Sequence, residues 1–562
     1  MSTPSRPRLR RRFVVPVAAL AVVAVSGGAV VLSGCGDTAS AGSAAASVAG
    51  YIPASSPVYV QVSTDTSGPQ WTQLTDLARY FPAYGTMQAR VEKELQKEGI
   101  SWQTDLKPLL GDAAALATTK VPDAANVAKG ALTNPAGAAG RALATAADQP
   151  VLAVLQIASG KADQVKALLA DPANGGLSAA GEYNGAAMYS DPTGGMHAAV
   201  APEALIIGSS EAVVKQAIDA HAAGGDQALS GVFRFNDALA LLPRDVFAMA
   251  YVNIDELGKA ASDIVPMAGD LVDGEITGAA AMSLTAETDG LHMKAVLVDA
   301  PALADQKAFT PTLTNVAPAD AIAYLGFNRL ADTVARVISS ASASASPEVK
   351  KQIDAVTGQL PVLLGVTADD LRNLTGGEHA VVVGGAQPTP SVSLALKTAD
   401  GAQADETLTS LSKSLPLVLG QFGPSGKLKT AAAKGFTPVN LGGVAGHELA
   451  VNSTGDIVWG VKGDLAVIGS RAAGVSTLLN GTGPGLADSA AFTAATQGMP
   501  DQVTGLAWIN VPQAMPMLAE KGAFAGKDGA GKREALSHVS GIAAWGTPGA
   551  NPTVDVFVGL QK

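Results

Sequence analysis

Histidines are the side chains of this sequence best suited to bind a transition metal, and the chain has six of them. They are His197, His221, His292, His379, His447 and His538. None forms H-E-x-x-H or another tight pair at metal-ligand spacing. Two stand next to a glutamate, in Glu378-His379 and His447-Glu448, but neighbouring side chains of a strand point to opposite faces. We therefore expect solvated hairpin residues, no metal and no cofactor. A zinc site that combines both pairs is the alternative.

A glycine-rich stretch could in principle hold phosphate. The segment 526–533, Gly-Lys-Asp-Gly-Ala-Gly-Lys-Arg, has the spacing of a Walker loop. Arg533 stands where a serine or threonine must hold magnesium, and no strand clearly precedes the segment. The sequence therefore predicts a flexible basic loop.

Serines at three places raise the question of nucleophilic catalysis. Ser410 and Lys413 have the S-x-x-K spacing of penicillin-binding enzymes, but no S-D-N or K-T-G partner follows, and the stretch fits an amphipathic helix. Ser209 and Ser470 follow glycines at equivalent strand ends, with no partnered base in view. A turn or cap role is expected for both. No catalytic residue is assigned.

Aromatic residues cluster early in the chain, at Trp71, Tyr80, Phe81 and Tyr84, with Trp102 nearby. Leu74, Leu77 and Phe81 have helical spacing, which favours a core face. The remaining rings could line a binding groove, but core packing is the preferred interpretation.

The first 35 residues have the layout of an export signal. Five arginines and no acid precede an apolar stretch from Phe13 to Leu32. The stretch ends in Leu-Ser-Gly-Cys at 32–35, which resembles a bacterial lipobox, and Cys35 is the only cysteine of the chain. We predict a lipoprotein signal peptide over 1–34, lipidation of Cys35 and a flexible tether over 35–50. An uncleaved membrane helix is the alternative, and Arg10-Arg11-Arg12 leaves both Sec and twin-arginine export open.

Net charge and cysteine content exclude several classes of function. The formal net charge is −11, and it becomes −16 once the five arginines of the signal are removed. Such a body should not bind nucleic acid, which needs clustered basic residues. It should also stand off anionic lipid headgroups. One cysteine excludes a disulfide framework.

The elements that would position these residues occur twice. Tyr51–Val60 matches Val316–Leu325 at an offset of 265 positions. Three further blocks match in the same order: Asp105–Asp112 with Asp370–Glu378, Leu205–Ser209 with Leu465–Ser470, and Leu242–Ile254 with Met499–Val511. Four matches in one order indicate an internal repeat. We predict two tandem homologous modules, 51–305 and 306–562.

Short strands and helices alternate irregularly within a module. Strands are expected at Val58–Val62, Val151–Ile157, Ala186–Tyr189, His197–Ala201 and Leu205–Gly208, helices at Lys161–Leu169, Glu211–His221 and Phe235–Leu242, and hairpins at Ala279–Val298 and Gly541–Leu560. Close strands separated by Pro/Gly turns favour antiparallel pairing. The predicted fold class is α+β, each module a mainly antiparallel sheet with packed helices. The Ala/Gly-rich stretch 121–149 is interpreted as an insertion in the first module.

Several short motifs carry a resemblance to a known family. They are Pro53-Ala54, Pro57-Val58-Tyr59-Val60, Ser67–Trp71, Arg79–Pro82 and Leu106–Gly111. The pattern resembles an actinobacterial envelope family catalogued as domain of unknown function 3352. The resemblance implies an N-terminal membrane segment or lipobox and an exported body. It implies no activity and no catalytic residue.

These observations predict a lipid-anchored protein on the outer face of the cell membrane, with no enzyme activity. Its expected role is binding or scaffolding in the cell envelope, with an envelope protein or an apolar molecule as partner. One alternative is a carrier of lipid or another apolar envelope molecule. A hydrolase of envelope polymers is a further alternative, which would need paired carboxylates or a Ser/His pair in a cleft.

Overall fold

The computed structural model describes residues 48–81, 89, 92–93, 96, 101–119, 150–171, 177–191, 196–257, 277–301, 306–328, 330, 365–384, 390–422, 431, 433–452, 455–481, 483–526 and 529–561. The predicted signal peptide, Cys35, the tether up to residue 47 and the stretch 121–149 lie outside these residues. The described part divides into two compact units, the first ending at Ala300 and the second beginning at Pro301.

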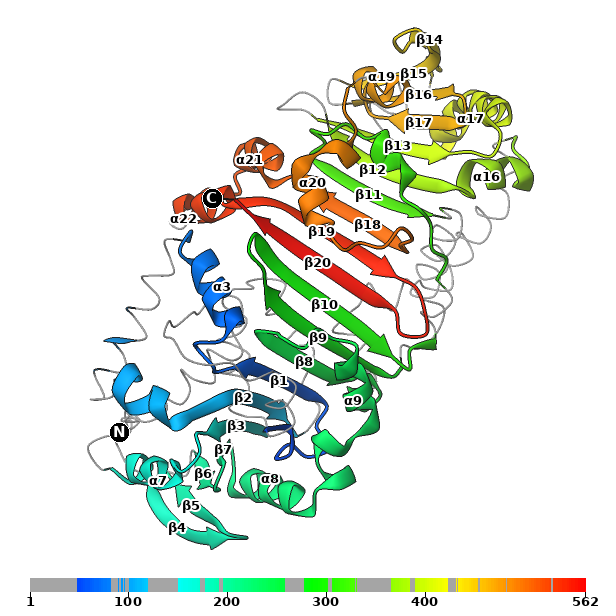
Figure 1. Cartoon of the computed structure of the whole chain (residues 1–562). Helices are drawn as coiled ribbons and strands as arrows, with labels where there is room; N and C mark the ends of the chain where they lie inside the picture. The colour runs from blue at the N-terminus through cyan, green and yellow to red at the C-terminus, as the bar shows by residue number, and fades with distance from the viewer. Residues whose placement is uncertain are drawn as a thin grey trace, which may run out of the picture. The chain divides into compact units, whose positions relative to one another are not determined.

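Unit 1 contains a sheet of ten described strands (Figure 1). They are β1 (Val58–Ser63), β2 (Leu110–Thr118), β3 (Val151–Ile157), β4 (Ser178–Tyr183), β5 (Ala186–Ser190), β6 (His197–Val200), β7 (Ala204–Gly208), β8 (Ala248–Asn253), β9 (Ala279–Ala286) and β10 (Gly290–Val298). Their order across the sheet is β10-β9-β8-β1-β2-β3-β7-β6-β5-β4, and every pairing within it is antiparallel. The turn from β4 to β5 uses Asn184 and Gly185, both at positive φ, as a tight hairpin requires.

The helices of unit 1 are α3 (Pro69–Ala78), α7 (Ala162–Ala170), α8 (Glu211–Ala223), α9 (Phe233–Ala240) and α10 (Ile254–Leu257), with short turns η1 (Trp102–Leu106), η2 (Lys107–Leu109), η4 (Gly225–Gln227) and η5 (Leu229–Gly231). Helix α8 begins at Ser210, whose hydroxyl accepts a hydrogen bond from the Val213 amide. Helix α8 buries Val214, Ala217 and Ile218 in the main core of the unit.

Unit 2 likewise contains ten described strands. They are β11 (Ala323–Asn328), β12 (Glu378–Gly384), β13 (Ser391–Lys397), β14 (Thr437–Asn440), β15 (Ala445–Asn452), β16 (Gly455–Lys462), β17 (Leu465–Gly469), β18 (Gly505–Ile509), β19 (Val539–Thr547) and β20 (Thr553–Leu560). The order is β20-β19-β18-β11-β12-β13-β17-β16-β15-β14, again antiparallel throughout. If the strands of each unit are numbered one to ten along the chain, the order of the strands across the sheet is the same in both units.

The helices of unit 2 are α16 (Ala368–Thr375), α17 (Gly401–Phe422), α19 (Ala472–Asn480), α20 (Ala490–Ala495), α21 (Val511–Glu520) and α22 (Gly529–Ser537), with short turns η6 (Thr312–Asn315) and η7 (Leu486–Asp488). Thr367 and Asp370 form a capping box at the start of α16. Antiparallel sheets with helices packed on them place the protein in the α+β class, as the sequence predicts.

Two predicted boundaries differ from the structure. Val48 and Ala49 are buried in the main core of unit 1, so the folded body begins before Tyr51 and inside the predicted tether. The division between the units falls after Ala300, five residues before the predicted module boundary.

Candidate functional site: two apolar sheet faces

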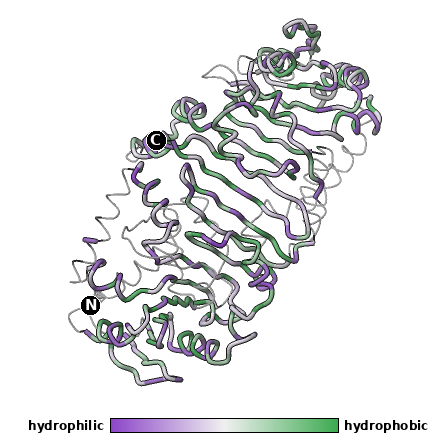
Figure 2. Tube along the Cα trace, in the orientation of Figure 1, coloured by the Kyte–Doolittle hydropathy of each residue, from purple (hydrophilic) through white to green (hydrophobic). Residues whose placement is uncertain are grey.

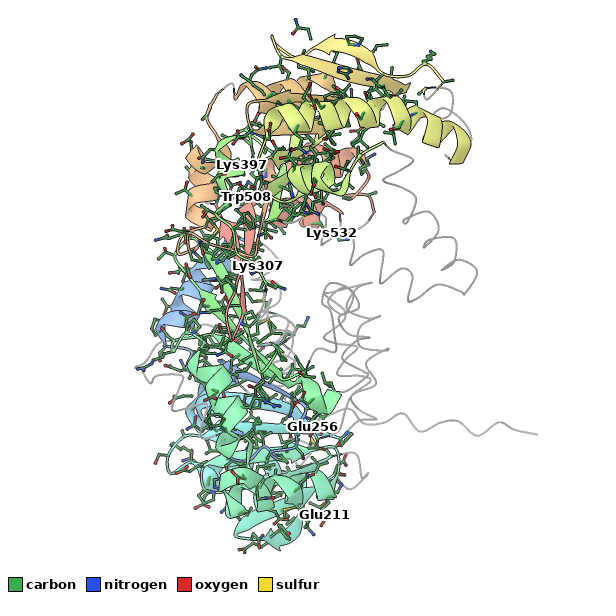
Figure 3. All side chains as sticks on the ribbon, turned by 90° about the vertical axis from the view of Figure 1, so that its right-hand side faces the viewer. Glu211, Glu256, Lys307, Lys397, Trp508 and Lys532 are labelled. Carbon is green, nitrogen blue, oxygen red and sulfur yellow. The ribbon has the colours of Figure 1, made fainter. Side chains whose placement is uncertain are left out.

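One face of each sheet forms the main hydrophobic core. In unit 1, Tyr59 of β1 lies directly opposite Tyr251 of β8, and Phe235 of α9 makes edge contacts with both rings, with centroids 5.5 Å and 5.1 Å away. In unit 2, Tyr324 of β11 lies opposite Trp508 of β18, a residue labelled in Figure 3, and Phe492 of α20 meets Trp508 edge-on at 5.7 Å. All these side chains except that of Phe492 are at most 1% exposed, and Phe492 is 4% exposed.

The opposite face of the unit 1 sheet is also apolar. Because side chains alternate along a strand, the residues between the core positions line up in rows across neighbouring strands. Two adjacent rows cross β2, β1, β8, β9 and β10: Thr118-Val58-Val252-Ala280-Leu297 and Leu116-Val60-Ala250-Met282-Ala295. All ten side chains are partly or well exposed, and Thr118 is the one polar residue among them.

Unit 2 repeats the arrangement on the corresponding strands β12, β11, β18, β19 and β20. Its rows are Val383-Ala323-Ile509-Ile542-Val558 and Val381-Leu325-Ala507-Ala544-Val556. Again none of the ten side chains is fully buried, and Leu325 and Ile509 are 49% and 43% exposed. We call these two sets of ten residues the apolar faces of unit 1 and unit 2. Figure 2 shows the apolar colouring along these strands.

Such faces depart from the usual behaviour of an antiparallel sheet. A sheet with one face on a core normally carries polar side chains on the other, because those side chains meet water. Contiguous exposed apolar surface instead marks a place where a protein binds something. Apart from the Thr118 hydroxyl, the twenty side chains of the apolar faces carry no hydroxyl, acid or base. The sequence prediction did not include these faces, although apolar residues at consecutive strand positions, as in Val58–Val60, are the signal.

The two glutamate–histidine pairs are held in structural roles. Glu378 and His379 are 8% and 0% exposed, which corrects the prediction that they are solvated. The Glu378 carboxylate accepts hydrogen bonds from the Thr312 hydroxyl and the Leu313 amide, at 2.5 and 2.8 Å. The imidazole Nε2 of His379 lies 3.0 Å from the Thr375 carbonyl oxygen, and burial lowers the pKa of this histidine.

The second pair has other neighbours. His447 stacks on Trp459 with ring centroids 4.5 Å apart. Burial, with the nearby Asp456 as a second cause, raises the pKa of Glu448. Within the part of the chain that the structure describes, no group of three His, Cys, Asp or Glu side chains could hold a metal ion.

The two candidate serine nucleophiles connect strands. The Ser209 hydroxyl accepts a hydrogen bond from the Val151 amide at 3.2 Å, and Ser470 does the same for Val392 at 2.9 Å. Each serine amide donates in return to the carbonyl of the same residue. Each serine therefore makes two hydrogen bonds to the neighbouring strand just after its own strand ends, which agrees with the expected turn role. Ser410 and Lys413 lie in α17, as the helical interpretation predicts.

The Walker-like segment is only partly a loop. Its residues from Gly529 onward form the start of α22, and the element before it is helix α21 rather than a strand. Lys532 is exposed, and the Arg533 guanidinium lies over the Phe524 ring at 5.1 Å. In a phosphate-binding loop the glycine-rich segment connects the end of a strand to the start of a helix, whereas here it connects two helices. The prediction of a flexible loop is therefore wrong for 529–533.

Trp71 packs as a core residue. It is 3% exposed, its indole nitrogen donates to the Ser63 carbonyl at 2.7 Å, and its ring meets Phe247 edge-on at 5.0 Å. It also borders a water-sized cavity of about 20 Å³ beside Asp65 and Asp112. Burial, and secondarily the Asp65 carboxylate, raises the pKa of Asp112. Trp102 and Leu77 are likewise buried, whereas Tyr84 lies outside the described residues.

Fold and faces together define an α+β protein with two partly exposed apolar sheet faces. Residues 14–544 match the family described as protein of unknown function, DUF3352, and the chain belongs to that family. No curated protein matches the chain.

Among solved structures, crystal forms III, I and IV of TP0453 are similar in part. Each is 10% identical to the chain. Form III covers 45% of this chain and 80% of TP0453, with a TM-score of 0.25. Forms I and IV each cover 44% of this chain and 77% and 79% of TP0453, each with a TM-score of 0.24. Likeness at this level supports no argument about fold or function. Among the helices described here, none is both long and apolar enough to cross a membrane.

Proposed function

We propose that this is an exported cell-envelope protein, held on the outer face of the membrane by lipid on Cys35, that binds a partner protein without catalysis. The apolar faces carry the proposal. Twenty aligned positions, nineteen of them apolar, remain partly exposed on two sheets. Leaving such surface in water is unfavourable, by about 25 cal/mol for each Å². A partner that covers it recovers that free energy.

Duplication of one module supports the same proposal. The shared strand order is accompanied by shared local contacts. The Leu229 amide donates to the Ile52 carbonyl at 2.7 Å, and the Leu486 amide donates to Ala317 at 2.6 Å. The bridges Pro53–Ala228 and Pro318–Gly485 also correspond. We propose that the units are two copies of one module, each of which brings one apolar face to the partner.

Photocrosslinking in intact cell envelopes tests the proposal on the full chain. A photoreactive residue replaces Leu325 or Val60 on the faces, and Lys532 on α22 serves as the exposed control position. We expect a defined protein adduct from positions 325 and 60 and none from 532. Adding Ile509→Asp beside the probe at 325 should abolish the adduct there, because burying an unpaired carboxylate is costly. Equal labelling from all three positions, or an adduct that survives Ile509→Asp, would overturn the proposal.

A carrier of lipid or another apolar envelope molecule is the second candidate. The observation that favours it is the absence of any side-chain donor or acceptor on the face of unit 2, since acyl chains need none. Native mass spectrometry of the gently purified protein separates the two. A bound molecule of defined mass that is lost in Ile509→Asp supports the carrier. A protein adduct without such a molecule supports scaffolding.

A further inference from the structure

A cavity in unit 1 lies where the folded body begins. Its volume is about 270 Å³, and it is lined by the buried residues Val48, Tyr51, Ala204 and Ala228 and by the more exposed Glu203 and His221. Gly50, Gly224 at the C-terminal end of α8, and Ser230 complete the wall. Four of the nine lining residues carry polar side chains, so the cavity differs chemically from the apolar faces.

Three features of this cavity each favour a positively charged ligand. Glu203 places a carboxylate on the rim. The carbonyl end of α8 carries the negative end of the helix dipole. The ring of Tyr51 stacks on that of His221 with centroids 3.8 Å apart and planes 9° apart, and the faces of tyrosine rings attract cations. Each feature favours a positively charged occupant.

Tyr51 stays neutral in this setting. Burial, with the carboxylate of Glu203 as the second cause, raises the pKa of Tyr51 to about 12. Its phenol therefore keeps its proton across the physiological range and does not add a second anion to the cavity. Glu203 is the acidic side chain among the lining residues.

Unit 2 repeats this set of side chains only in part. The strand correspondence places Val316 at the position of Tyr51 and Asp464 at that of Glu203. Counted from the residues that precede α8 and α19, Ser210 and Arg471, His221 corresponds to Thr482. After η7, Ala487 stands where Ser230 stands. The acidic position is thus shared by both units, whereas the Tyr51–His221 ring pair belongs to unit 1 alone.

We propose that this cavity binds a small organic cation, of the primary ammonium class, with Glu203 as its counter-ion and the Tyr51–His221 pair as its aromatic wall. The apolar faces are not involved, so this site stands independently of the proposed partner protein. A volume of about 270 Å³ admits a ligand of few heavy atoms, below the size of most drug-like molecules.

Ligand-observed saturation-transfer NMR on the full mature chain tests the site, with n-butylammonium as the probe and n-butanol as the uncharged control. We expect saturable binding of the ammonium and at least tenfold weaker binding of the alcohol. Glu203→Gln should weaken ammonium binding by about tenfold, the scale of a lost charged hydrogen bond. Tyr51→Val and His221→Thr, the residues of unit 2, should weaken it as well.

Asp226→Asn is the matched control, because Asp226 is an exposed acid that lies in the sequence between the lining residues Gly224 and Ala228 but does not itself line the cavity. It should change the ammonium affinity by less than about twofold. Equal binding of butanol and butylammonium, no saturable binding, or equal effects of Glu203→Gln and Asp226→Asn would each overturn the proposal. Glu203 is exposed, so its substitution should leave the fold intact, and a thermal melt checks this.

Discussion

The ring of His379 is completely buried in unit 2, although imidazole normally titrates close to neutral pH. Its Nε2 faces the Thr375 carbonyl, and Nδ1 has no hydrogen-bond partner among the described residues. Phe327 packs edge-on against the ring with centroids 5.7 Å apart. An imidazolium would lose its hydration here without gaining a counter-charge. Burial therefore lowers the pKa of His379, against the smaller opposite effect of the Thr375 carbonyl.

This environment makes stability depend on pH. In the unfolded state His379 has a pKa of about 6.5, so below that pH it is protonated there while it remains neutral in the folded state. The stabilisation is thus fully present above about pH 6.5 and is lost as the pH falls towards the lowered folded pKa. We expect the free energy of unfolding to fall with a slope approaching 1.4 kcal/mol per pH unit for this one proton. His379→Gln should flatten the curve between about pH 5 and 6.5.

Chemical denaturation at several pH values measures the effect. His221→Gln, at an exposed histidine, is the matched control and should keep most of the slope of the original protein. If His379→Gln and the control gave the same slope, His379 would not be the group responsible.

At the scale of the elements, the pair of strands β18 and β19 is adjusted to the largest buried side chain of its core. A Cβ atom on Gly541 of β19 would lie 2.0 Å from the Trp508 ring, which is fully buried. In unit 1, Tyr251 of β8 takes the position of Trp508, and it pairs with Ala281 of β9 as Trp508 pairs with Ala543. Ala279, two residues before Ala281, therefore takes the position of Gly541. The smaller ring is thus accompanied by alanine and the larger one by glycine. Close packing of this kind leaves no room for an added methyl group.

Gly541→Ala should therefore destabilise unit 2 by about 1–3 kcal/mol, the usual range for overpacking. Combining it with Trp508→Tyr recreates the combination of unit 1 and should cost less than the sum of the two single changes. Equilibrium denaturation of the single and double variants measures the coupling. Strict additivity would mean that the ring and the glycine do not compete for the same space.

Sequence patterns predicted these elements unevenly. Val151–Ile157 and the hairpin Ala279–Val298 were predicted because they are apolar runs bounded by turn residues. Strand Leu110–Thr118 was missed, because its alanines carry little β-propensity. In the pairing with the first strand of each unit, Ala113 rather than Asp112 takes the position of Glu378, because Ser63 pairs with Ala113 as Asn328 pairs with Glu378. The apolar faces depend on which strands become neighbours, and β1 lies between β2 and β8, a partner about 190 residues away in the chain.

At the scale of the whole molecule, the predicted signal in the N-terminal segment would decide where the two apolar faces can act. If residues 1–34 are removed, the net charge becomes −16, and a body of that charge would be repelled by anionic headgroups and would need a covalent anchor to remain at a membrane. The two readings of residues 1–35 predict different molecules. Lipoprotein processing would attach lipid to the Cys35 thiol and cleave off residues 1–34, which leaves Cys35 as the first residue, whereas an uncleaved membrane helix keeps all of them.

We expect the protein extracted from membranes to begin at Cys35 and to carry a diacylglyceryl group. Intact mass spectrometry reads both the missing 34 residues and the added lipid, and metabolic labelling with a fatty acid analogue gives an independent readout. Cys35→Ser should abolish the label, because serine offers no thiolate to the lipid donor. Retention of residues 1–34 without label in the unaltered protein would establish the helix instead. The apolar faces would then act on a body anchored by a single span of about 20 apolar residues.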